Sequence, residues 1–352
     1  MVTKNRIGKI FLYLLLTGIF LMPLVKLILM GFNDDTGWTL QVFTNILHEP
    51  RTIATIKNTI YIAVISSFLA TIAGLILAFF AAYTNICGKS ILEILTLSPL
   101  VIPSYIIAIS WAQLLDKNGI IYNILLSLKI TPVDVYSIGG IIFVMGICHI
   151  PIVYLVVINA MRRIPRDLEW AARLSGCSIG RTMLKINLPL IMPTVINGFI
   201  LSFLSAVDNF AIPAFLGISS NIPVLSTYIY EKTIGFGPAS FHIAAAVSMI
   251  LAVIAVSVTL LQQRFAGKTF SFIKAKEDFS ARVLFTGTKK KMTETGLFFV
   301  MGLLMLMPLL ATIVVSIQKG IGTGFALSNL SLSNFDFLLK NAGAHNAIIN
   351  SL

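Results

Sequence analysis

The sequence predicts an all-α membrane protein, a polytopic bundle of about seven transmembrane helices. The 352-residue chain is 57% hydrophobic and 11% charged, whereas soluble domains are roughly 45–50% apolar. Its apolar residues gather into long uncharged segments, and about 20 such residues cross the hydrocarbon core as a helix. These segments cover residues 58–88, 94–115, 135–161, 186–207, 233–263 and 295–318, with a seventh at 10–30 that only Lys26 interrupts.

We expect the helices at 10–30, 58–83, 93–115, 137–160, 190–209, 240–262 and from 295 onward. The window 209–230 is also uncharged, but Pro213, Gly217 and Pro223 interrupt it, so we interpret it as a loop. The first helix follows a basic N-terminus, as a signal peptide would, yet no small-x-small cleavage site ends it. It should therefore remain as an uncleaved helix.

The distribution of Lys and Arg predicts the orientation, because cationic loops stay on the cytoplasmic side. With the N-terminus inside, the inner segments carry 18 Lys or Arg and the outer segments carry 7. We therefore expect a multi-pass membrane protein, surrounded by lipid, with a cytoplasmic N-terminus. The net charge of +12 follows from this bias, and no motif for nucleic-acid binding is present.

The residues that could hold a metal or form disulfides are few. Cys87, Cys148 and Cys177 fall in or near the predicted cytoplasmic half, where thiols stay reduced, so no disulfide framework is expected. The four histidines are dispersed along the chain, which argues against a metal site. We predict no metal and no cofactor.

An internal repeat predicts the domain organisation. Leu-Met-Pro-Leu occurs at 21–24 and again at 306–309, each time in an apolar run that follows a cluster of Lys or Arg. Such self-similarity indicates a duplicated unit. We expect a first half at 1–262 with six helices, a cationic cytoplasmic linker at 263–294, and the start of a second, incomplete half at 295–352. Phe272 and Ile273 would allow the linker to lie on the membrane surface, but a plain tether is the favoured interpretation.

The loop 162–189, between two apolar runs, is strongly basic. Its cationic residues are Arg162, Arg163, Arg166, Arg173, Arg181 and Lys185. Pro165 suits a first helical turn, Gly176 a helix C-cap, and Ser178 the N-cap of a second short helix that Pro189 delivers into the membrane. We therefore predict a cytoplasmic helix-turn-helix whose small residues allow close approach to a partner.

This loop resembles that of the integral-membrane permease subunits of binding-protein-dependent ABC importers. The family pattern is Glu-Ala-Ala, then Gly four residues later, then Ile-x-Leu-Pro. The matching residues are Ala171, Ala172, Gly176, Ile186, Leu188 and Pro189. The family glutamate falls on Trp170, and Glu169 lies one residue earlier. The resemblance covers nearly all of residues 1–290 and implies a type I importer permease fold.

The resemblance also implies partners. In the family this loop is the coupling helix that docks on a cytoplasmic ATP-hydrolysing subunit, of which two are expected, and an external solute-binding protein delivers the solute. A second permease half, or another permease chain, would complete the pathway. The chain itself should be no enzyme, because its Gly-Lys-Ser at 88–90 and Gly-Lys-Thr at 267–269 both lack the first glycine of a phosphate loop.

Four residues are candidates for the solute pathway or its gate. Asp208 is an acid at the outer end of a predicted helix, where a charge is costly; the alternative is a hydrated helix end. His149 is a second candidate, with a packing role as the alternative. Pro99 and Pro103 should break the third helix and free backbone carbonyls, as in discontinuous transport helices, although a packing kink is the common cause.

The sequence thus favours an ABC importer permease, with ferric iron as the expected solute. Thiamine, phosphonate and polyamine importers of the fused type are the alternatives. An ion-driven carrier or channel is the alternative class, but it leaves the basic helical loop unexplained. An intramembrane enzyme would need a catalytic pair in the membrane, which the sequence does not offer.

Overall fold

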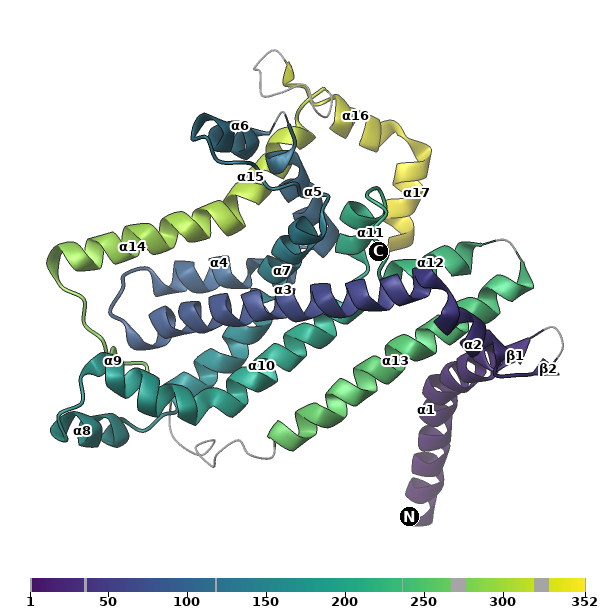
Figure 1. The fold of residues 1–352 in the computed structure, drawn as a ribbon, viewed down its shortest axis with the longest axis horizontal. Helices are drawn as coiled ribbons and strands as arrows, with labels where there is room; N and C mark the ends of the chain where they lie inside the picture. Colours follow the sequence, from purple (N-terminus) through teal and green to yellow (C-terminus); the bar gives the residue numbers. More distant parts are fainter. Residues whose placement is uncertain are drawn as a thin grey trace. The chain divides into compact units, whose positions relative to one another are not determined.

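A computed structural model describes residues 2–34, 37–117, 119–235, 237–266, 277–319 and 329–351. Phe272 and Ile273, on which the alternative of a linker on the membrane surface depends, lie outside these residues. The described chain is almost entirely helical (Figure 1). Its named strands within those ranges are the two-residue β1 (Asn33–Asp34) and β2 (Gly37–Trp38), which pair antiparallel.

The helices follow one another with few long connections. In chain order they are α1 (Val2–Gly31), α2 (Gln41–His48), α3 (Pro50–Tyr83), α4 (Lys89–Val101), α5 (Ser104–Leu115), α6 (Ile120–Ser127), α7 (Ile138–Arg162), α8 (Arg166–Leu174), α9 (Ile179–Thr182), the π-helix η1 (Met183–Asn187), α10 (Leu188–Asp208), α11 (Ala211–Gly217), α12 (Leu225–Ile234), α13 (Pro238–Ala266), α14 (Gly287–Met301), the π-helix η3 (Gly302–Leu306), α15 (Met307–Ser316), α16 (Ser333–Lys340) and α17 (Ala342–Ser351).

The predicted number of spans is confirmed. Within the described residues, six helical segments are long and apolar enough to cross a membrane, and α4 with α5 forms a seventh if the bent pair counts as one span. The axes of α4 and α5 differ by 106°. The predicted break of the third helix is therefore present, at the residues between Pro99 and Pro103.

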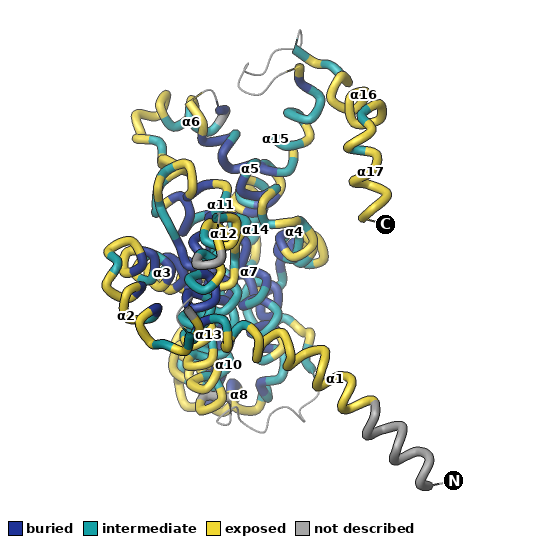
Figure 2. The backbone as a smooth tube through the Cα atoms, turned by 90° about the vertical axis from the view of Figure 1, so that its right-hand side faces the viewer, coloured by how far each residue is buried: buried dark blue, intermediate teal, exposed yellow. Residues whose placement is uncertain are grey.

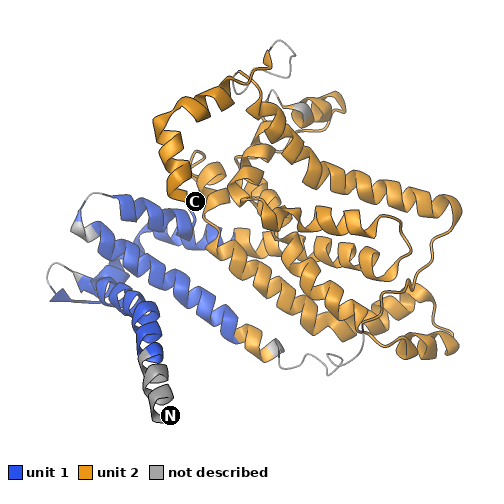
Figure 3. Ribbon diagram, turned by 180° about the vertical axis from the view of Figure 1, so that it is seen from behind, with its two compact units in different colours: residues 1–61, 223–260 blue, residues 62–222, 261–352 orange. Residues whose placement is uncertain are grey.

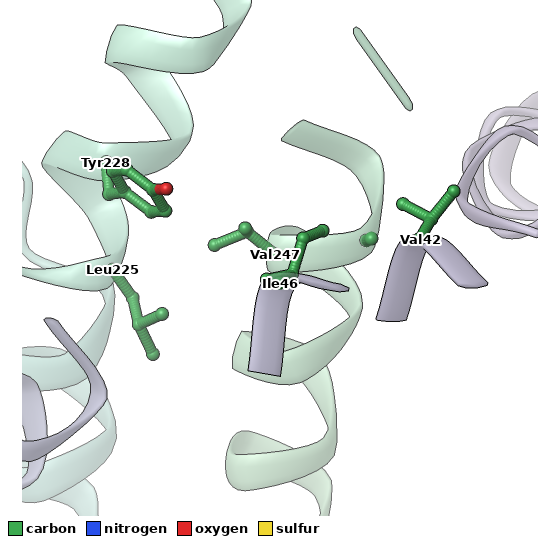
Figure 4. Packing of buried hydrophobic residues seen from close by; sticks show 6 residues of the cluster. Val42, Ile46, Leu225, Tyr228 and Val247 are labelled. Atoms are coloured by element: carbon green, nitrogen blue, oxygen red, sulfur yellow. The ribbon is translucent and has the colours of Figure 1, made fainter. Parts of the chain in front are cut away.

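The chain divides into two compact units (Figure 3). Unit 1 contains Met1–Tyr61 and Pro223–Leu260. Its core joins α2, α12 and α13 through Val42, Ile46, Leu225, Tyr228 and Val247 (Figure 4). In contrast, residues 12–29 of α1 are almost all exposed (Figure 2), and none of the 18-residue apolar window of this helix is buried within the chain.

Unit 2 contains Ile62–Ile222 and Leu261–Leu352. Its central helix is α7, of which 78% of the apolar window is buried. Helices α4 and α10 pack against α7, while α5 packs against α11 and α15. Glycines allow the close approach: a Cβ at Gly74 would lie 2.9 Å from Cβ of Val153, and one at Gly198 would lie 3.3 Å from Cγ1 of the same residue.

Two expectations about irregular segments need correction. The window 209–230 is not a simple loop, because α11 lies within it and α12 begins there, and Ile212 and Leu216 of α11 are fully buried. The predicted linker 263–294 is also partly helical, because α13 continues to Ala266 and α14 already begins at Gly287. In α11 apolar burial stabilises a helix that the proline and glycine pattern alone does not indicate.

The predicted division into a first half, a linker and a second half differs from the compact units. The segment after residue 295 packs against first-half helices, since α14 contacts α4 and α15 contacts α5. The hydroxyls of Ser110 and Thr312 hydrogen-bond across the second of these contacts. The evolutionary halves remain a prediction from the repeat, while packing places 295–351 with the bundle of unit 2.

Candidate functional site

The basic loop folds into the predicted helix-turn-helix. Pro165 precedes the first helix, α8, and Gly176 adopts φ +84° directly after its end. The N–H of Cys177 donates to Ala172 O (3.1 Å) and that of Gly176 to Arg173 O (3.0 Å), which is the Schellman arrangement that glycine permits. Ser178 caps α9 by accepting the N–H of Arg181. The caps predicted from sequence are confirmed.

Helix α8 has a buried face and an exposed apolar face. Glu169 and Ala172, three residues apart, are buried. Trp170 and Leu174, four residues apart, are 53% and 90% exposed, and Ala171 between them is exposed. Large apolar groups this exposed on a short helix mark a surface for binding another molecule. Ala172 points inward, so its small size serves packing within the chain and not approach by a partner.

The second half of the loop is the first part of a membrane-spanning helix. Residues 179–208 are helical without interruption, so Ile186 lies within η1 while Leu188 and Pro189 begin α10. The N–H of Leu188 bonds to Met183 O, one residue further back than in an α-helix. A proline clashes with the carbonyl four residues before it, and the wider π-turn provides the room.

Glu169 lies at the centre of a buried polar cluster. Its Oε1 accepts from the guanidinium of Arg282 and from Nδ2 of Asn187 (2.6 Å). The same Asn187 amide donates to the hydroxyl of Tyr83 (3.2 Å), and the Arg282 guanidinium stacks 4.6 Å from the Tyr83 ring. The Arg282 and Glu169 side chains are 2% and 8% exposed. Four elements therefore meet here: α3, α8, η1 and the segment before α14.

The segment 277–285, which we call the linker strap, binds both the entry of the loop and the end of α3. Arg282 N–H and Val283 N–H both donate to Tyr83 O, at 2.7 and 2.8 Å, and Asp278 N–H donates to Arg162 O at 2.8 Å. The Arg282 guanidinium also donates to Ile164 O at 2.7 Å. The predicted tether is thus a packed structural element.

Side-chain pairs add to the contact between the linker strap and the loop. Arg166 Nε donates to Asp278 Oδ2 at 2.6 Å. Its Nη2 donates to the carbonyls of Ser280 and Ala281, both at 3.1 Å. Arg163 pairs with Glu277 at 3.0 Å. Burial disfavours the ionised form of Asp278, but hydrogen bonds from Ser280 and the charge of Arg166 outweigh this and hold its pKa below the ordinary value. The arginines thus bind this chain's own carboxylates.

The pathway candidates occupy different surroundings. Pro99 is buried beside a small apolar cavity that Ile102 and Pro308 also line, whereas Pro103 is exposed at the start of α5. His149 is 3% exposed, and its Nδ1 has no hydrogen-bond partner among the described residues. Asp208 is exposed at the last residue of α10. The structure does not bring these four residues together into one site, and their roles stay predictions.

The described residues contain no group of three or more His, Cys, Asp or Glu side chains that could hold a metal ion. The free thiols differ in access: Cys87 is exposed, Cys177 partly exposed and Cys148 buried. The loop region thus combines exposed apolar side chains on α8 with a buried ion pair beneath them.

Comparison with known proteins gives the family. The model of the binding-protein-dependent transport system inner membrane component matches residues 70–270, more than half of the chain. The chain belongs to this family. It is the membrane-spanning permease of an ABC importer, and the predicted type I permease fold is confirmed.

The permease is similar to several characterised proteins. It is 25% identical to the sulfate transport system permease protein CysT of Salmonella typhimurium over 70% of this chain and 88% of that protein. It is 23% identical to the ferric transport system permease protein FbpB of Actinobacillus pleuropneumoniae, over 64% and 34% respectively. A chain of a bacterial ABC transporter that imports alginate matches with a TM-score of 0.60 and 20% identity, over 76% of this permease and 99% of that chain.

Sequence reasoning missed three members of the buried cluster: Tyr83, Asn187 and Arg282. In the sequence, Tyr83 stands out only as the last residue of a predicted apolar helix. Asn187 stands out only as a polar residue at the edge of an apolar segment. Arg282 was one of eight cations in the linker, although its position between Ala281 and Val283, in an apolar stretch, distinguishes it. An arginine that is buried among apolar neighbours requires a charged or polar partner. The apolar neighbours of Arg282 in the sequence were therefore the one feature that could have indicated a buried ion pair.

Proposed function

We propose that the exposed face of α8 docks on a cytoplasmic ABC ATPase and passes its closure to the membrane helices. The observation that carries this proposal is the exposure of Trp170 and Leu174 on a helix whose opposite face is anchored by Glu169. A partner that covers these side chains would gain apolar burial. Trp170, in the position of the family glutamate, would supply an aromatic anchor instead of a charge.

The remaining partners follow from membership in the family. Two ATPase subunits would act on two permease halves, and the second half would be a further part of the chain or another permease. A solute-binding protein outside the membrane would deliver the solute. The protein would lie in the inner membrane of a bacterium with its N-terminus and the loop 162–189 in the cytoplasm, as the bias of Lys and Arg indicates.

The proposed solute is ferric iron, supported by the resemblance to fused permeases and by the FbpB relative. Sulfate is the second candidate, because the CysT relative matches over most of its own length. Uptake of radioactive iron and of radioactive sulfate by cells that express the complete system would distinguish them. Uptake of sulfate alone would overturn the iron proposal.

Co-purification tests the docking proposal. The permease, expressed together with an ABC ATPase subunit from the same genome, should retain the ATPase in detergent, and Leu174→Arg should reduce the retained amount about tenfold. The matched control is Leu339→Arg, which changes a 76% exposed leucine of α16. Equal retention by both variants would contradict the proposed docking face.

Thiol labelling tests the orientation. In membrane vesicles of known sidedness, a charged maleimide should reach Cys87 and Cys177 from the cytoplasmic side only, while the buried Cys148 stays unlabelled. Each cysteine can be replaced by serine to assign the label. Labelling of Cys177 only from the outer side would overturn the orientation and, with it, the docking proposal.

A further inference from the structure

We propose that Arg282 is a positioning residue that locks the linker strap to α8, so that a displacement of α8 is carried directly into α14. This inference rests on the proposed docking of an ATPase on α8. It assigns a mechanical role to residues 277–285, which join the six-helix half to the segment predicted to begin the second half.

The first step of the argument is the burial of the Arg282–Glu169 pair. Both side chains are almost completely shielded from solvent, and a charge so buried is stable only while its partner remains. Glu169 Oε1 also accepts from Asn187 of η1, and Arg282 also donates to Ile164 O. Movement of α8 relative to the linker strap would separate Glu169 from Arg282 and leave both charges buried, so the two elements should move as one body.

The second step is that the linker strap is held on both sides of Arg282. On one side, Asp278 binds Arg166 and the carbonyl of Arg162 at the entry of the loop. On the other, Phe285 and Asn85 exchange two hydrogen bonds, of 2.8 and 3.0 Å. The linker strap therefore reaches from the loop to the turn after α3, and hydrogen bonds fix it at both of its ends.

The third step is continuity with α14. This helix begins at Gly287, two residues after Phe285. Its first turns are attached to the turn after α3, since Glu294 Oε1 accepts the N–H of Cys87 (2.7 Å) and the ring of Phe298 would lie 3.1 Å from a Cβ at Gly88. Through η3 and α15 the same helix packs against α4 and α5. A shift of the strap would thus reach the bent helix pair.

The fourth step separates this role from contact with the ATPase. Glu169 faces inward, so its carboxylate is occupied by Arg282 and Asn187 and is not presented to a partner. Trp170 and Leu174 face outward. Docking and transmission are therefore assigned to different faces of the same helix, and variants can separate them.

The experiment measures a distance within the permease–ATPase complex. Spin labels at Leu168→Cys on α8, an exposed position outside the proposed docking face, and at Met292→Cys on α14, also exposed, are introduced after the native cysteines are replaced. Double electron–electron resonance then compares the nucleotide-free and ATP-bound complexes. In the otherwise unchanged protein the distance should change by less than about 2 Å, because the two helices move together.

Variants supply the decisive comparison. Arg282→Ala should change the label distance by about 5 Å or broaden its distribution on ATP binding, and should reduce solute-dependent ATP hydrolysis about tenfold. Lys340→Gln, which breaks an exposed pair on α16, is the control and should leave both values unchanged. The charge-swapped pair Glu169→Arg with Arg282→Glu should restore part of the coupling and shows that the effect is not misfolding.

The outcomes distinguish the two proposals. If the unchanged permease binds no ATPase, the docking proposal fails. If it binds ATPase, and Arg282→Ala and the charge-swapped pair both keep the distance constant and hydrolysis coupled, the positioning role of Arg282 is overturned while docking stands.

Discussion

Two ion pairs of this permease consist of the same side-chain types in different surroundings. Arg51 and Glu231 in unit 1 lie 2.6 Å apart, and their side chains are 48% and 46% exposed. Arg282 and Glu169 in unit 2 are 2% and 8% exposed. Water screens the first pair, so its contribution to stability is small. In the second pair, protein groups must replace the water molecules that burial removes from both charges.

The comparison shows what a membrane transporter can do with a buried pair. An exposed pair can break and reform with little free-energy change, so it transmits no displacement. A buried pair with further hydrogen bonds, as between Glu169 and Asn187, cannot separate without a large penalty. In the permease such a pair lies on the buried side of α8, beneath the face on which an ATPase is proposed to dock.

The largest expected effect follows from removal of one buried charge. Glu169→Ala should lower the free energy of unfolding by about 3 kcal/mol, because Arg282 is left buried with only the more distant Asp278, at 3.8 Å, as a counter-ion. Urea unfolding in detergent, followed by tryptophan fluorescence, measures this value. A loss below about 1 kcal/mol would mean that the buried pair contributes no more to the free energy of unfolding than the exposed pair does.

A paired replacement sharpens the same contrast. Exchanging both Glu169 and Arg282 for Met should restore most of the stability that either single change loses, because an apolar pair needs no solvation. Coupling of ATP hydrolysis to the solute should nevertheless remain low, since methionines are flexible and do not fix a geometry. Recovered stability together with normal coupling would argue that the pair only stabilises the fold.

An intermediate effect is expected for Arg166, whose side chain is 30% exposed. Arg166→Gln removes its charge-assisted bond to Asp278 and should cost about 1.5 kcal/mol of unfolding free energy. The matched change Arg163→Gln, in a pair 34% and 32% exposed, should cost less, about 0.5 kcal/mol. The same unfolding assay ranks the two, and the reverse order would show that the further hydrogen bonds of Arg166 to Ser280 and Ala281 do not govern the difference.

A smaller effect concerns pH. The pKa of Asp278 is lowered in the folded state from an ordinary value of 3.8, so its contribution is present above about pH 4 and is lost as the pH falls through the lower folded-state value. Hydrogen exchange of the Asp278 and Ser280 amides should therefore accelerate in acid beyond its intrinsic pH dependence. Asp278→Asn should lack this additional acceleration, and an identical pH profile in that variant would refute the assignment.

The smallest effect is expected at the exposed pair itself. Arg51→Ala should change the unfolding free energy by about 0–1 kcal/mol, and high salt should abolish the difference. Thermal unfolding at low and high salt checks this. A loss as large as that of Glu169→Ala would mean that Tyr228, over which Arg51 also lies at 5.7 Å, makes the site far stronger than its exposure indicates.

Local sequence determined much of this protein. Lipid cannot satisfy backbone hydrogen bonds, so each long apolar segment must be helical, and the predicted spans appear with the break between Pro99 and Pro103. The caps at Gly176 and Ser178 were also predictable, because a positive φ and an N-cap depend on residues within one turn. The family of the permease followed from the spacing of the same loop.

Only the tertiary structure decided which face of α8 is anchored and by what. Glu169 and Arg282 are 113 residues apart, and neither periodicity nor charge counting singles out one linker arginine as the partner of one loop glutamate. The helicity of α11 and the inward position of Ala172 were likewise unpredictable from their neighbours. Burial depends on elements distant in sequence, and burial is what converts an ordinary ion pair into a rigid connection.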